Sequence, residues 1–128
     1  MTNRSLRSAR DVVELYNLQV WNNRDIALAE ELFADTVTRH AVGGVHTLTR
    51  AEAVKRVVDL WERFDKLFFE LNRVIAGDDG EFVTIIYDST MTNKDGSEMP
   101  IASIEVFRVV NGEITEVWNC GYGQGVWQ

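Results

Sequence analysis

Cysteine and proline are almost absent from this sequence, whose 128 residues include one of each. The single cysteine, Cys120, has no partner for a disulfide within the chain, so no such crosslink can hold the fold together. Cysteine usage of this kind is typical of a reducing compartment. The amino-terminal residues also lack the apolar core and cleavage motif of a secretion signal. We therefore expect a cytoplasmic protein that is stabilised by the packing of a hydrophobic core.

Long apolar runs and a surplus of positive charge are missing as well. No run approaches the roughly 20 apolar residues that a membrane-spanning helix requires. Lys and Arg number 13 against 20 Asp and Glu, which gives a formal net charge of −7 at pH 7. A chain with this charge repels the phosphate backbone of DNA and RNA. We expect a soluble protein without nucleic-acid or membrane partners.

Apolar side chains, in contrast, are plentiful. Hydrophobic residues make up 45% of the chain and aromatic residues 10%, a composition that excludes an intrinsically disordered protein. The length suits one hydrophobic core, and no repeat or linker divides the chain. We expect a single domain over residues 1–128.

Three segments in the first half of the chain have helical periodicity. Residues 8–22 place their apolar side chains on one stripe, and Tyr16 points inward with that stripe. A second, shorter helix is predicted over residues 25–34. The third begins at Thr49, where Glu52 three positions later completes a capping box.

The second half of the chain has the alternation of β-strands. A short β-branched strand over residues 36–42 ends at two glycines, and a loop with His46 at the mouth of the fold follows. From residue 66 onward, turns at 77–80, 93–96 and 111–112 separate segments that alternate in steps of two. This order predicts an α+β fold in which helices cover one face of a curved antiparallel sheet.

Polar residues interrupt otherwise apolar or small faces of these strands. Glu105 shares one face of its strand with apolar and small residues, and Asn119 and Asp88 do the same in their strands. His40 shares a face with Thr38 in the short strand. A curved sheet with these faces turned inward would form a pocket with converging polar groups.

Several stretches resemble the nuclear transport factor 2-like superfamily. They are the Asn-Asn-Arg-Asp-Ile hairpin at 22–26, the Leu-Phe-Ala-Asp run at 32–35, and residues 107–118 with their Asn-Gly-Glu-Ile turn. The resemblance covers nearly the whole chain and is closest to the SnoaL-like group of polyketide cyclases. It implies a cone-shaped curved sheet wrapped by three helices, with an enclosed pocket and a homodimeric assembly.

Two branches of the superfamily suggest roles for individual residues. Compared with ketosteroid isomerases, His40 falls at the position of the base if one residue is skipped, and Glu105 at that of the protonated acid. Tyr16 falls at the oxyanion tyrosine, with Asn17 competing for that position. Compared with limonene epoxide hydrolases, Asp88 matches the acid that protonates the epoxide, but two of that family's groups are missing. Asn119 stands at the water-activating aspartate, and Ile86 replaces the arginine between the two carboxylates.

The residues and the resemblance together predict a cofactor-independent acid–base enzyme of isomerase or cyclase type. Its expected ligand is a hydrophobic polyketide-, terpenoid- or steroid-like small molecule. We assign His40 as the base and Asp88 or Glu105 as the acid, because a histidine accepts protons near neutral pH and a buried carboxylic acid can donate one. The residues expected to bind the substrate are Tyr16, Asn119, Thr38, Ile86, Ser103, Phe107, Val117 and Trp61. No local ligand spacing of a zinc or iron site is present, and we expect neither a metal nor an organic cofactor.

Other interpretations remain open at this point. The same fold carries epoxide hydrolases and dehydratases, and it also carries domains that only bind or assemble. His40 is equally compatible with a structural role, and Asp88 with binding a backbone amide or closing a turn. Asn119 is compatible with orienting one of the carboxyl groups.

Overall fold

The computed structural model describes residues 7–128, which form three helical regions and a seven-stranded sheet. Helix α1 (Ala9–Glu14) continues as the π-helix η2 (Leu15–Trp21), and α2 (Ile26–Leu32) and α3 (Arg50–Arg63) follow. The strands are β1 (Phe33–Ala41), β2 (Gly44–Thr49), β3 (Phe64–Ala76), β4 (Phe82–Asn93), β5 (Glu98–Val110), β6 (Glu113–Asn119) and β7 (Gly123–Gln124).

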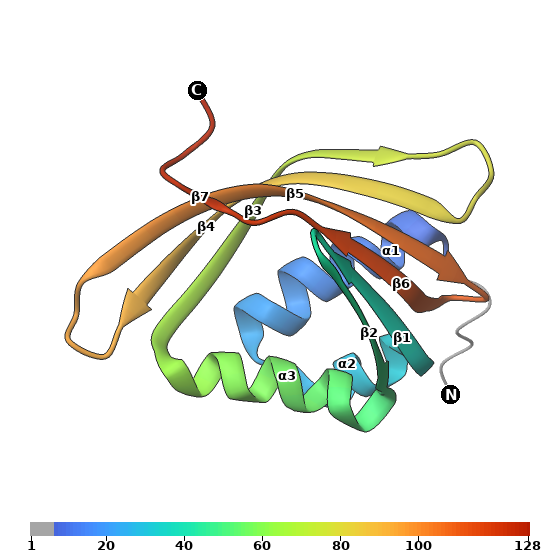
Figure 1. Ribbon diagram of the computed structural model, residues 1–128, viewed down its shortest axis with the longest axis horizontal. Coiled ribbons are helices and arrows are strands. Elements are labelled where there is room, and N and C mark those ends of the chain that lie inside the picture. The colour runs from blue at the N-terminus through green and yellow to red at the C-terminus, as the bar shows by residue number, and fades with distance from the viewer. Residues whose placement is uncertain (1–6) are drawn as a thin grey trace.

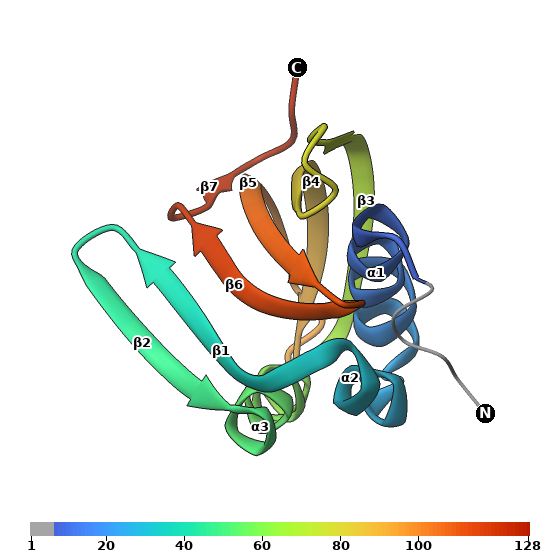
Figure 2. The ribbon, with the colours of Figure 1, turned by 90° about the vertical axis from the view of Figure 1, so that its right-hand side faces the viewer.

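The sheet has the order β2-β1-β6-β5-β4-β3, and the short β7 pairs with β5. Strands β3 to β6 form the predicted antiparallel meander, whereas β1 pairs with β6 in parallel. Figures 1 and 2 show these strands arching over the helices, with α3 across the open side of the arch. The predicted α+β fold with a curved mixed sheet wrapped by helices is confirmed.

Hydrogen bonds cap the first and third helices at the predicted starting positions. The Ser8 hydroxyl accepts from the Asp11 amide at 3.0 Å, and the Thr49 hydroxyl accepts from the Glu52 amide at 3.2 Å. The Glu52 carboxylate in turn accepts from the Thr49 amide at 2.9 Å, which completes the capping box. These contacts satisfy amides that a helix start leaves without partners, and each is worth about 1 kcal/mol.

Two details differ from the sequence expectations. Most of residues 43–49, expected to be a loop, instead form β2 (Gly44–Thr49), which pairs with β1 through a turn at Gly43 with φ of +90°. Gly43 is therefore a hairpin turn residue, and Gly44 is the first residue of β2, paired with Ala41. His46 is an exposed strand residue there and does not line the cavity described below. Helix α2 also ends two residues earlier than predicted, because the chain turns extended at Phe33.

The hydrophobic core lies between the concave face of the sheet and the helices. Val12, Val20 and Leu32 on the helical side and Ile85 and Phe107 on the strands are fully buried. Burial of a side chain of this size stabilises the folded state by about 1.5–3 kcal/mol. Within residues 7–128, no helix combines the length and the apolar character that crossing a membrane would demand.

Candidate functional site

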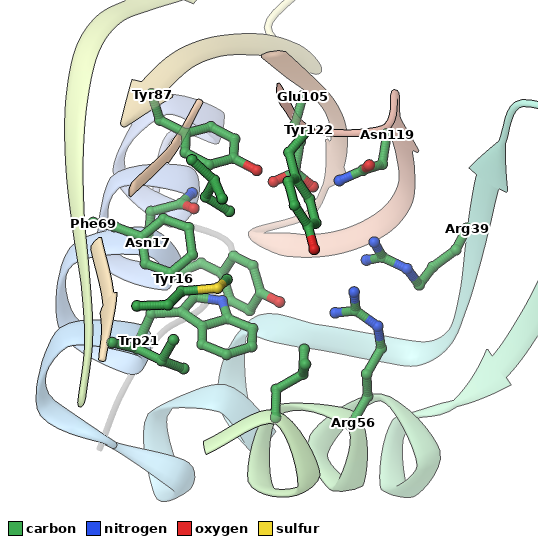
Figure 3. Close-up of a pocket in the computed structure, with 14 residues that line it drawn as sticks. Tyr16, Asn17, Trp21, Arg39, Arg56, Phe69, Tyr87, Glu105, Asn119 and Tyr122 are labelled. Atoms are coloured by element: carbon green, nitrogen blue, oxygen red, sulfur yellow. The ribbon is translucent and has the colours of Figure 1, made fainter. Parts of the chain in front are cut away.

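A cavity of about 190 Å³ interrupts this core between η2, α3 and the concave face of the sheet. Figure 3 shows Trp21 and Phe69 on one side of it and Arg39, Arg56 and Asn119 on the other. The apolar lining residues are Trp21, Leu60, Leu67, Phe69, Met91 and Ile101. The polar lining residues are Tyr16, Asn17, Arg39, Arg56, Tyr87, Glu105, Asn119 and Tyr122.

Glu105 and Asn119 reach the cavity from neighbouring strands, as the alternation predicted. They are directly paired in the register of β5 and β6, and their side chains project from the same face. Glu105 supplies the only carboxylate among the described residues that line the cavity. The sequence pattern thus predicted the position of Glu105 at the cavity.

Two buried phenols face this carboxylate. Tyr16 extends from η2, and its ring packs edge-on against Phe33 and Phe107 at centroid distances of 5.3 and 5.9 Å. Tyr87 extends from β4, and its hydroxyl points into the cavity (Figure 3). Burial raises the pKa of both tyrosines, and the Glu105 charge raises the pKa of Tyr87 further. The positive charges of Arg56 and Arg39 offset part of the increase in the pKa of Tyr16. Both hydroxyls therefore keep their protons and can donate hydrogen bonds to a ligand.

The π-helix explains how the first helical region presents two consecutive residues to the cavity. Tyr16 and Asn17 are both buried and both line it. The Asn17 amide donates to the Val13 carbonyl at 2.8 Å, so this side chain is anchored within its own helix. Short π-helical segments occur often at functional sites. Both residues that compete for the position of the oxyanion tyrosine therefore line the cavity.

Two arginines at the cavity were not predicted. Arg39 extends from β1 and Arg56 from α3, and Figure 3 shows both guanidinium groups pointing inward. Burial lowers the pKa of Arg56, and the positive charge of Arg39 lowers it further. Sequence signals for both existed. Arg39 shares a face of β1 with Val37, which is 1% exposed, and Arg56 lies next to Val57, a buried residue of α3.

His40 lies on the opposite face of the sheet, so the expectation that it faces the pocket is wrong. Its Nε2 is 2.8 Å from Glu116 Oε2, and its ring stacks on Trp118 with centroids 4.7 Å apart. Thr38 lies on that outer face too, where its hydroxyl is 3.4 Å from that of Thr47. The physical reason is the strand period of two, since skipping one residue in a comparison reverses the face of every side chain.

Asp88 and Ile86 are likewise on the outer face and not at the cavity. The Asp88 carboxylate accepts from the Trp127 amide at 3.1 Å and from the Asn72 side chain at 3.0 Å. Ile86 pairs with Ile104 on the same face. The expectation for β4 is wrong because apolar and hydroxyl side chains stand on both faces of this strand, with Tyr87 and Ser89 on the inward one, so the alternation alone does not identify that face. Binding of a backbone amide, the alternative given for Asp88, is what the structure shows.

The remaining four residues expected to bind the substrate are buried behind the cavity wall. Ser103 donates to the Cys120 carbonyl at 3.4 Å, and Phe107 and Val117 belong to the fully buried core. Trp61 is buried in α3, with the Arg24 guanidinium 4.6 Å from the centre of its ring. None of these four lines the cavity, although Ser103 and Phe107 contact tyrosines that do.

The chemistry available in the cavity is proton transfer and hydrogen bonding. Glu105 can accept a proton, and the phenols and guanidinium groups can donate hydrogen bonds to an oxygen that gains negative charge. Across residues 7–128, no group of three or more His, Cys, Asp or Glu side chains is arranged to hold a metal ion.

Comparisons with known proteins agree with this geometry. The model of the SnoaL-like domain family matches residues 12–117. A solved structure of SalBIII, an epoxide hydrolase/cyclase-like enzyme in pyran ring formation in polyether salinomycin, is similar with a TM-score of 0.77. Its identity is 23%, over 93% of this chain and 95% of that chain.

Two further solved structures have the same fold. A candidate polyketide cyclase from Acidithiobacillus ferrooxidans has a TM-score of 0.76 and 20% identity, over 92% of this chain and 89% of that one. A protein from Catenulispora acidiphila with a ketosteroid isomerase-like fold, solved with trimethylamine, has a TM-score of 0.67 and 18% identity, over 85% of this chain and 83% of that one. No curated protein matches the sequence. The chain belongs to the SnoaL-like domain family and has the nuclear transport factor 2-like fold that the sequence resemblance implied.

Proposed function

We propose that this protein is a cofactor-independent acid–base enzyme of cyclase or isomerase type. Its substrate is a hydrophobic carbonyl compound of polyketide, terpenoid or steroid character. The observation that carries the proposal is the carboxylate of Glu105, the only one at the cavity among residues 7–128, in the same cavity as the protonated hydroxyls of Tyr16 and Tyr87. This arrangement differs from the sequence-based assignment, in which His40 was the base.

In the proposed reaction, Glu105 removes a proton from the carbon beside a substrate carbonyl. The electron pair of that C–H bond moves into the C–C–O system, and the carbonyl oxygen becomes an enolate oxygen. Tyr16 or Tyr87 donates a hydrogen bond to this oxygen, which stabilises its charge in a site that excludes most water. In a cyclase the enolate carbon then attacks a second carbonyl of the same molecule, and the alkoxide oxygen that forms takes the proton back from Glu105. In an isomerase the proton returns from Glu105 to another carbon.

The acidic groups at the cavity also distinguish between the reactions that proteins of this fold catalyse. Epoxide hydrolysis of the kind suggested by the resemblance needs Asp88 as an acid beside a water-activating base. Asp88 instead holds Trp127 and Asn72 on the outer face of the sheet. Enolate chemistry needs one base and hydrogen-bond donors, which the cavity contains. This supports cyclase or isomerase chemistry over hydrolysis.

A homodimer is part of the proposal. The outer face of the sheet carries an apolar patch, defined here as Ile75, Ile86, Ile104 and Val106, on neighbouring strands β3, β4 and β5. Ile75 is 54% exposed and Ile104 is 39% exposed. Exposed apolar patches on a sheet often mark protein interfaces, and the fold resemblance implies a symmetric dimer.

The enzymatic proposal can be tested by following exchange of the α-protons of 2-tetralone in deuterated water by NMR. This bicyclic ketone is neutral, and enolisation replaces its α-protons with deuterium. The wild-type protein should accelerate exchange, and Glu105→Gln should reduce the accelerated rate by about 100-fold or more, as expected for loss of a general base.

Glu98→Gln is the matched control, because Glu98 is an exposed residue at the start of the same strand. It should exchange 2-tetralone at the wild-type rate. If the wild-type protein gave no acceleration, or if Glu105→Gln were as fast as wild type, the proposed chemistry would be wrong. The cavity would then be interpreted as a binding pocket without catalysis.

A further inference from the structure

The cavity has a cationic end that the proposed proton transfer does not require. Arg39 and Arg56 come from separate elements, β1 and α3, and their guanidinium groups converge at that end (Figure 3). The side chains of Asn119 and Tyr122 lie on the same side in this view. Enolate formation at Glu105 needs hydrogen-bond donors, and the two buried phenols already supply them.

The charges at this end are not balanced within the described chain. Two guanidinium groups and one carboxylate line the cavity, which leaves one unit of positive charge. Over residues 7–128, neither Arg39 nor Arg56 forms a hydrogen bond or a salt bridge with another side chain, whereas Arg50 and Arg108 each pair with two carboxylates. The protein as a whole carries a net charge of −7, so this positive site contrasts with its surroundings.

Holding two like charges on one cavity wall is unfavourable without a counter-charge. Arg39 and Arg56 repel each other, and burial removes part of the water that would screen them. A bound anion would remove this repulsion and would gain charge-assisted hydrogen bonds. Guanidinium groups suit carboxylates in particular, because their planar donors match the two carboxylate oxygens.

The other end of the cavity indicates the remainder of the ligand. Trp21, Leu67 and Phe69 form an apolar wall across from the arginines, and Trp21 and Phe69 pack against each other at 5.6 Å. A molecule that fills about 190 Å³ would therefore place an apolar, ring-sized body against this wall. Glu105 lies between the two ends, above the centre of the cavity in Figure 3.

We infer that the natural substrate is a monoanion, a carboxylate attached to an apolar body. The carboxylate binds Arg39 and Arg56, the body lies against Trp21 and Phe69, and the carbon that loses its proton lies beside Glu105. A single negative charge neutralises the one excess positive charge, whereas a doubly charged phosphate would exceed it. This inference rests on the proposed function for the role of the site, and it adds the class of substrate.

The test compares two ligands of nearly equal shape, 2-naphthoate and the neutral 2-naphthylmethanol, by isothermal titration calorimetry. The wild-type protein should bind 2-naphthoate more tightly. Arg39→Gln and Arg56→Gln should each weaken 2-naphthoate binding by about tenfold or more, the effect of losing one charged hydrogen-bond partner. Each should change 2-naphthylmethanol binding by less than about twofold, since its contacts do not depend on the charge.

Two variants serve as controls. Arg63→Gln removes an exposed cation from the last turn of the same helix α3 and should leave both affinities unchanged. Arg56→Lys keeps the charge without the planar donors, and it should bind 2-naphthoate between wild type and Arg56→Gln. Equal affinity of the wild-type protein for the two ligands, or no binding of 2-naphthoate, would overturn the inference. So would 2-naphthoate binding that is insensitive to both arginines.

Glu105→Gln separates this inference from the proposed reaction. Removal of a negative charge from the cavity should strengthen 2-naphthoate binding several-fold, although the same change should slow the exchange of neutral 2-tetralone. Exchange that persists in Glu105→Gln would refute the reaction and leave the anion site standing. Weak 2-naphthoate binding together with Glu105-dependent exchange would refute the anion site alone.

Discussion

At the scale of single residues, the environment of Tyr87 shows how the fold prepares a hydrogen-bond donor. The phenol extends from β4 into the cavity, 4% exposed, with Phe69 at a centroid distance of 5.4 Å. Burial is the main cause of its raised pKa, and the Glu105 charge is the next. A donor that keeps its proton throughout the neutral and mildly alkaline range can serve a substrate oxygen without depending on pH.

The raised pKa of Tyr87 predicts a pH dependence of stability. The folded protein retains the phenolic proton to higher pH than the unfolded chain, where the pKa is 10.0. Above about pH 10 the folded state therefore binds more protons, and the free energy of unfolding falls as the pH rises. Urea denaturation from about pH 8 to about pH 11 should show this decline in the wild-type protein and a smaller one in Tyr87→Phe. Parallel curves for the two proteins would refute the assigned pKa direction.

Two pairs of adjacent residues show why part of the site could not be predicted from the sequence. Arg39 and His40 are adjacent, as are Tyr87 and Asp88, and in both pairs the residue with the more familiar catalytic chemistry faces outward. The outward residues have identifiable partners, namely Glu116 for His40 and Trp127 for Asp88. Such partners are invisible in a sequence, because they come from segments 76 and 39 residues away.

At the scale of elements, the inward face was predicted correctly for strands with a clear alternation of side chains and incorrectly for the others. In β5 the inward face carries Ile101, Phe107 and Val109, all buried, so Glu105 was placed correctly among them. In β4 both faces contain apolar and hydroxyl side chains, so the alternation alone does not identify the inward one. The strand predicted over residues 36–42 offered few residues for the same decision, whereas β1 begins already at Phe33. Its pairing with β2 was not expected, although that pairing defines the hairpin.

Among the helices, too, some features could be predicted from the sequence and others could not. The capping box fixed the start of α3 from four residues of sequence, because its hydrogen bonds are local. The widening of the first helix into η2 has no comparable local signal, and Tyr16 of η2 packs against Phe33 and Phe107, which come from distant parts of the chain. Contacts of this kind depend on the finished fold, and the consecutive placement of Tyr16 and Asn17 at the cavity could not be derived beforehand.

At the scale of the whole molecule, the resemblance predicted the architecture and the existence of a cavity. Its walls come from η2, α3, β1 and β3 to β6, so they assemble only when the sheet curves over the helices (Figure 2). Alternation predicted Glu105 and Asn119, which lie on a strongly patterned pair of strands. The arginines were missed because a charged residue within an apolar stripe is usually assigned to the surface.

The proposed homodimer predicts that the apolar patch is covered in solution. Sedimentation velocity at micromolar concentration should give about twice the 14.6 kDa of one chain. Ile104→Lys introduces a charge into the patch and should shift the protein to the monomer. Val42→Lys is the control, since Val42 is 88% exposed beyond the end of β1 and lies outside the patch. A monomeric wild-type protein would contradict the dimer and leave the cavity unaffected.

The central claim is that substrate is bound and activated in the cavity on the concave face of the sheet. The most direct measurement is a crystal structure of the protein with 2-naphthol, a stable mimic of the 2-tetralone enolate. The account predicts the naphthol ring against Trp21 and Phe69, with its oxygen within about 3.2 Å of the Tyr16 or Tyr87 hydroxyl. An empty cavity, or naphthol bound on the outer face beside His40 and Trp118, would contradict it.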